Sequence, residues 1–73
     1  MKIEEKFNKR DAKLIEVQSP SVTTGRHLAL GISLAFHTLP GSDDPRALRM
    51  HLTPDEALHL AELLISAVRK ARD

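Results

Sequence analysis

Residues 28–36 read Leu28-Ala29-Leu30-Gly31-Ile32-Ser33-Leu34-Ala35-Phe36, and large apolar side chains occupy every even position. The odd positions carry only alanine, glycine and serine. Because successive side chains of a β-strand point to opposite faces, this alternation predicts a strand over 27–38 with one core-facing side. The other side is thin and smooth, and it is either open to water or covered by another molecule. The residues of this predicted contact face are Ala29, Gly31, Ser33 and Ala35.

Two further strands are expected at 13–18 and 47–52, where apolar and polar residues again alternate. The intervening segments 19–25 and 39–45 contain the proline, glycine and small hydroxyl residues that are typical of loops and turns. Residues 1–12 are highly charged, and we interpret them as an N-terminal arm or a short edge element.

The pairing of the central hairpin follows from its apolar residues. Matching the two inner faces places Leu34 opposite Leu52, since a slip by one residue would exchange the faces. In this register His37 and His51 are diagonal neighbours on the outer face. A zinc site needs three or four protein ligands, and no third ligand is expected near this pair. We therefore expect no metal site.

A helix is predicted from about 54 to 71. Thr53 is a good N-cap, Pro54 suits the first helical position, and Glu56 completes a capping box. The predicted fold is therefore α+β: an antiparallel meander of three strands, or four if the arm joins it, with the C-terminal helix packed on one face as a two-layer sandwich. Residues 13–73 are expected to form a single β-β-β-α domain.

The predicted helix is apolar around more than half of its circumference. Leu64 belongs to the arc expected to cover the sheet, and we expect Leu64 and Leu34 to be buried. Leu58 and Ile65 lie on one flank of this arc and Leu63 lies on the other. Exposed apolar flanks are typical of interaction surfaces, so these three residues are predicted to contact a second copy or another protein.

The composition of the 73 residues excludes several kinds of chemistry. There is no cysteine, the net charge is only +1, and the only aromatic residues are two phenylalanines. No glycine-rich phosphate loop is present, and no nucleophile, base and acid are expected to meet in a pocket. We therefore expect neither an enzyme nor a bound cofactor. The charged N-terminus and the lack of roughly 20 consecutive apolar residues predict a soluble cytoplasmic protein outside membranes.

These observations favour a non-enzymatic protein that forms homo-oligomers and binds a partner protein, such as a bacterial or phage-encoded inhibitor or adaptor. The alternative is a small nucleic-acid accessory protein whose basic residues contact phosphates. Its candidate contact residues cluster near the N-terminus and at the end of the predicted helix: Lys6, Lys9, Arg10, Lys13, Arg69 and Lys70.

Overall fold

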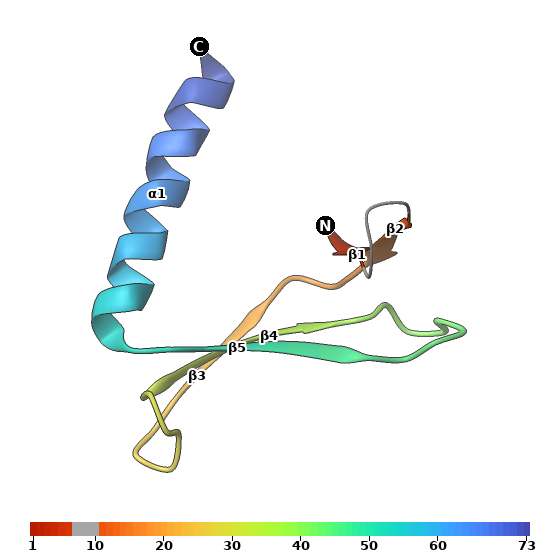
Figure 1. Ribbon diagram of the computed structural model, residues 1–73, viewed down its shortest axis with the longest axis horizontal. Coiled ribbons are helices and arrows are strands. Elements are labelled where there is room, and N and C mark those ends of the chain that lie inside the picture. Colours follow the sequence, from red (N-terminus) through yellow and green to blue (C-terminus); the bar gives the residue numbers. More distant parts are fainter. Residues whose placement is uncertain (7–10) are drawn as a thin grey trace.

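The computed structural model describes residues 1–6 and 11–73 and contains five antiparallel strands and one C-terminal helix (Figure 1). Strands β1 and β2 form one sheet, and β3, β4 and β5 form a second sheet in this order. The expected α+β class is confirmed. The elements are β1 (Lys2–Lys6), β2 (Ala12–Glu16), β3 (Ser21–Thr24), β4 (Ile32–His37), β5 (Ala47–Leu52) and α1 (Pro54–Arg72).

The long strand expected over 27–38 is shorter at its N-terminal end, because β4 begins only at Ile32. Gly31 has a φ of 96°, a left-handed conformation that suits glycine and interrupts an extended chain. The Leu28 carbonyl accepts a hydrogen bond from the Gly31 amide at 3.2 Å, so residues before β4 turn back towards β3. The predicted loop at 19–25 is also wrong in part, since β3 lies within it and pairs with β4.

The register of the β4–β5 hairpin differs from the expected one by two residues. Leu34 pairs with Met50, and Leu52 pairs with Ile32 instead of Leu34. A shift by two keeps every side chain on its face, because the side-chain period of a strand is two. The grouping of residues by face was therefore predicted correctly, whereas the cross-strand neighbours were not.

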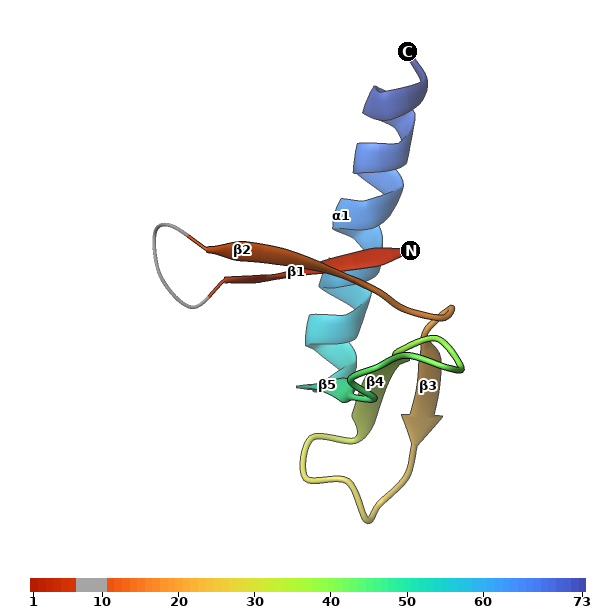
Figure 2. The ribbon, with the colours of Figure 1, turned by 90° about the vertical axis from the view of Figure 1, so that its right-hand side faces the viewer.

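The predicted helix and its capping box are confirmed. Thr53 Oγ1 accepts a hydrogen bond from the Glu56 amide at 3.2 Å, and Glu56 Oε1 accepts one from the Thr53 amide at 2.9 Å. These two bonds satisfy amide groups that have no partner within the first helical turn. Only Thr53 separates the end of β5 from the start of α1, so the helix leaves the sheet abruptly, and it projects away from it (Figures 1 and 2).

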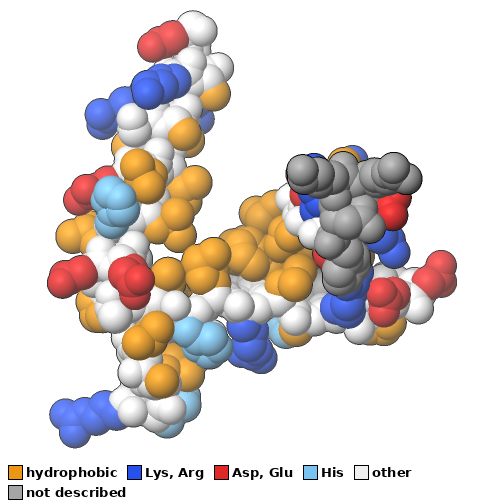
Figure 3. Space-filling model, viewed as in Figure 1, with side chains coloured by type: hydrophobic (Ala, Val, Ile, Leu, Met, Phe, Trp, Pro, Cys, Tyr) orange, Lys and Arg blue, Asp and Glu red, His pale blue; other side chains and the backbone are white. Residues whose placement is uncertain are grey.

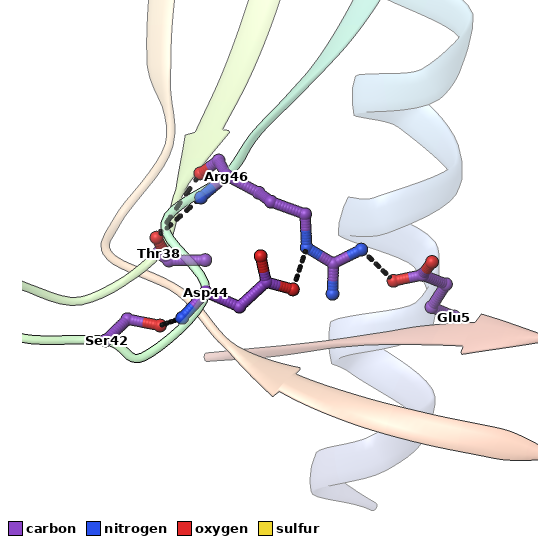
Figure 4. A network of polar contacts seen from close by, with 5 residues as sticks. All are labelled: Glu5, Thr38, Ser42, Asp44 and Arg46. Carbon is purple, nitrogen blue, oxygen red and sulfur yellow. Dashed lines mark hydrogen bonds and ion pairs between the residues drawn. The ribbon is translucent and has the colours of Figure 1, made fainter.

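The β1–β2 hairpin is attached to the end of β4 by backbone and side-chain contacts. The Gln18 amide donates to the His37 carbonyl at 2.8 Å, next to a bridge between Val17 and Thr38. Figure 4 shows the second attachment, where Arg46 forms an ion pair with Glu5 of β1. The Thr38 hydroxyl accepts a hydrogen bond from the Arg46 amide at 3.0 Å, which holds this arginine beside the hairpin.

Few apolar residues of the described chain are buried: Ile15, Val17 and Ala35. No residue of α1 is buried. Leu34 is only half-buried, and Leu64 is 58% exposed, so the expectation that both lie in a core is wrong. The physical reason is that α1 approaches the sheet next to β5 and then rises away from it, which leaves most of its length without a layer to pack against.

Candidate protein-interaction surface

An apolar groove runs between the sheet and the helix. Strands β3, β4 and β5 provide its floor, and the first half of α1 provides its wall. In Figure 3 hydrophobic side chains gather in this concave angle, between the helix and the strands below it. We call this groove the apolar corner, and it is lined by Val22, Ile32, Leu34, Leu52, Ala57, Leu60, Ala61 and Leu64.

Local sequence features create the apolar corner. The even-numbered residues Ile32 and Leu34 of β4 share one face, and Val22 pairs directly with Leu34 from the edge strand. The capping box starts the helix immediately after β5, and residues at helical spacing then face the strands. Ala57 and Leu60 are half-buried in this way.

The apolar corner is open to solvent. Val22 is 65% exposed and Leu64 is 58% exposed, although both line the groove. A soluble monomer rarely leaves large neighbouring aliphatic side chains in water, because their burial contributes about 25 cal/mol for each Å². The geometry therefore provides a surface with apolar lining residues, to which an apolar partner can bind.

The flanks of α1 add to this exposed apolar area. Leu58 and Ile65 on one flank are 61% and 53% exposed, and Leu63 on the other flank is also exposed. The structure therefore places all three predicted interface residues of the helix where a partner can reach them, as far as the described residues show.

The predicted contact face of the sheet has a different structure. Ala29 and Gly31 lie in the loop before β4, so the expectation that they share a strand face with Ser33 and Ala35 is wrong. Ser33 is only 2% exposed, and Ala35 is also buried. Both belong to the central strand, where larger side chains on the two neighbouring strands flank them: Thr23 and His51 beside Ser33, and Ser21 and Arg49 beside Ala35.

His37 and His51 lie at opposite ends of the β4–β5 hairpin. His51 pairs with Ser33, and His37 pairs with Ala47 at the other end of the hairpin. The expectation that these histidines are diagonal neighbours is therefore wrong, because it depended on the other register. In the described part of the chain, no group of three potential ligands is placed to hold a metal ion.

The basic residues of the nucleic-acid alternative fall in separate places. Lys6 and Lys13 belong to the β1–β2 hairpin, whereas Arg69 and Lys70 belong to the last turn of α1, which lies far from that hairpin in Figure 1. Lys9 and Arg10 were also predicted for this role, and both lie outside the described residues. Lys13 pairs with the acidic Glu5, so opposite charges alternate on the hairpin.

The electrostatic features of the site are modest. The backbone hydrogen bond from Thr53, followed by the Thr53 side-chain bond, holds the pKa of Glu56 below its ordinary value of 4.5. This shift arises from the hydrogen bonds of the helix cap, at the base of the helix wall of the apolar corner. It does not indicate a catalytic acid or base, since Glu56 is exposed and faces no pocket.

Sequence reasoning missed Val22 because the residue lies in a segment of serine, threonine and proline that resembles a loop. The signal that could have found it is Val22-Thr23-Thr24, a run of β-branched residues that favours a strand. The sequence-based prediction also placed Leu64 in a closed core, whereas the structure places this residue on an open groove.

No protein-family model matches the chain, and neither a curated protein nor a solved structure is significantly similar to it. Among the described residues, α1 is the single helix, and it lacks the length of apolar sequence needed to cross a bilayer.

Proposed function

We propose that this protein is a non-enzymatic protein-interaction module that acts as a homo-oligomer. The observation that carries this proposal is the open apolar corner, where aliphatic residues from three strands and a helix converge without being covered. A hydrophobic corner of this kind binds another protein surface through burial of apolar area.

We further propose a second protein partner, since an inhibitor or adaptor role fits a small chain whose described residues form an open groove with an apolar lining. The exposed apolar residues of the helix favour the binding of a protein partner more than the outer face of the sheet does. Ser33 and Ala35 are almost fully buried, so they offer little area to a partner.

Light scattering coupled to size-exclusion chromatography tests the proposal. The purified protein should show a mass that is a multiple of 8.1 kDa over a wide range of concentration. Leu64→Glu places a charge in the apolar corner and should lower the mass, whereas Ser66→Glu on the polar side of α1 should not. A monomeric mass for the unchanged protein at every concentration would contradict the proposal.

A further inference from the structure

We propose that the oligomer is a two-fold dimer in which α1 of one copy packs antiparallel against α1 of a second copy. The contact runs along one stripe of the helix, which we call the helix seam: Leu58, Ala61, Ile65 and Val68. This inference rests on the proposed function and names the occupant of the exposed helix flank.

The exposed area of the chain is that of half a dimer. Its accessible surface is 6196 Å², while a compact monomer of 8.1 kDa exposes about 4,500 Å². The excess of roughly 1,700 Å² per chain corresponds to about 3,400 Å² for two copies, which lies in the range of obligate homodimers. The radius of gyration agrees, since it is 14.6 Å where a compact domain of this length has about 11 Å.

The helix seam has the spacing of a helix–helix contact. Its four residues are separated by three, four and three positions, which is the pattern of the core positions of a coiled coil. Leu58 is 61% exposed and Ile65 is 53% exposed, so the chain itself leaves the seam open. The apolar corner adjoins the seam at Ala61, which lines both surfaces.

The helix seam is complementary to itself when reversed. Around a two-fold axis near residue 63, Leu58 lies opposite Val68 of the second copy, and Ala61 lies opposite Ile65. Each layer then combines a larger with a smaller side chain, which lets facing residues interdigitate. A surface that matches its own reversed copy is the requirement of a two-fold contact, in which both subunits use the same patch.

The charges beside the helix seam favour the antiparallel orientation. Asp55, Glu62 and Arg69 repeat every seven residues along one border of the seam. In the antiparallel pair, Asp55 lies next to Arg69 of the second copy, and this attractive pairing occurs twice. The two Glu62 side chains meet only once, at the axis, so the two opposite-charge pairs outnumber the single like-charge contact. A parallel pair instead brings acidic first turns together and basic last turns together, and it aligns the helix dipoles unfavourably.

The other border of the helix seam carries only apolar residues: Ala57, Leu64 and Ala71. In the antiparallel pair these residues from both helices lie on one common side. Since Ala57 and Leu64 line the apolar corner, the second helix extends the apolar layer of the first. Pairing along the seam therefore also covers part of the corner.

Site-directed cross-linking tests the arrangement, because the natural chain has no cysteine that could interfere. Each variant carries one cysteine at a polar, exposed position of α1, so the fold is preserved, and a short bismaleimide links thiols that lie close together. Glu62→Cys should link to its own copy near the two-fold axis. Asp55→Cys and Arg69→Cys should link to each other only in a mixture of the two variants, and Ser66→Cys on the outer side should not link.

A matched pair of substitutions adds an independent measurement. Leu58→Glu lies in the helix seam and Leu63→Glu lies on the opposite flank, and the unchanged leucines have similar exposed fractions. The scattering mass should fall by half for Leu58→Glu and stay dimeric for Leu63→Glu.

The results separate the two proposals. A dimer whose Glu62→Cys variant does not link, or whose mass falls only with Leu63→Glu, overturns the helix pairing and leaves the homo-oligomer intact. A monomer at every concentration overturns the homo-oligomer itself. The linking pattern described above, together with loss of the dimer in Leu58→Glu, supports both.

Discussion

The substitution Thr53→Ala tests the short connection that sets the helix on the sheet. Thr53 Oγ1 is the acceptor for the Glu56 amide at 3.2 Å, and alanine leaves this amide without its partner in the protein. Loss of such an N-cap acceptor costs about 1 kcal/mol of the free energy of unfolding. For a chain of this length, this corresponds to a fall of about 4–8 °C in the melting temperature.

The measurement is thermal unfolding followed by circular dichroism at one fixed protein concentration, since association would shift the midpoint as well. Thr53→Ser retains a hydroxyl acceptor and should stay close to the unchanged protein. Ser66→Ala lies within the helix, where alanine has the higher propensity, and should not lower the midpoint. If Thr53→Ala and Ser66→Ala have the same midpoint, the capping bond does not stabilise the fold and the reasoning fails.

Three other predictions address the cap, the loop before β4 and the hairpin. The folded-state pKa of Glu56 is lowered, so its ionised carboxylate stabilises the fold above the unfolded-state pKa, and this stabilisation is lost as the pH falls below 4.5. When the unfolding midpoint is measured at decreasing pH, Glu56→Gln should therefore lose less stability than the unchanged protein. Gly31→Ala should lower the free energy of unfolding in urea by about 1–2 kcal/mol, since the alanine side chain makes the left-handed conformation at a φ of 96° unfavourable. An unchanged midpoint would contradict this conformation. Arg46→Met should speed amide exchange in β1 and β2 and leave β5 unchanged, because its ion pair with Glu5 holds the hairpin; equal exchange in both proteins would refute this role.

The sequence predicts the helix well because the determining interactions are local. Thr53, Pro54 and Glu56 lie within one turn, and their side chains satisfy the first amides of α1 without any distant contact. The faces of β4 and β5 are predictable for a related reason, since alternation assigns each residue to a face before any neighbour is known.

The extent and partners of the strands depend on interactions that are distant in sequence. The alternation continues from Leu28 through Phe36, yet Gly31 adopts a left-handed conformation and β3 supplies the neighbouring strand. Alternation cannot distinguish one long strand from a loop followed by a shorter strand, because the same pattern of apolar residues at even positions is compatible with both structures. The pairing of Leu34 with Met50 instead of Leu52 has the same origin, since a shift by two leaves the faces intact.

The candidate surface was predictable in its residue types and not in its position. Leu58 and Ile65 were recognisable as surplus apolar residues of the helix, because no single sheet can cover more than half of a helix. The burial of Ser33 was not recognisable, because it depends on the larger residues that flank it on two other strands. An isolated strand pattern says which side chains are small, and only the assembled sheet says whether they can be reached.

The position of α1 connects the fold of this protein to its proposed function. The helix joins the sheet through Thr53 alone, and the described apolar residues between them are only half-buried or exposed. The angle between helix and sheet is therefore set by the capping box and by few packing contacts. A partner that fills the apolar corner contacts both the helix wall and the strand floor. Its binding therefore adds apolar packing between helix and sheet that the single chain lacks. In the proposed complex, association and the final shape of the corner are therefore coupled, and a substitution such as Leu64→Glu is expected to weaken both together.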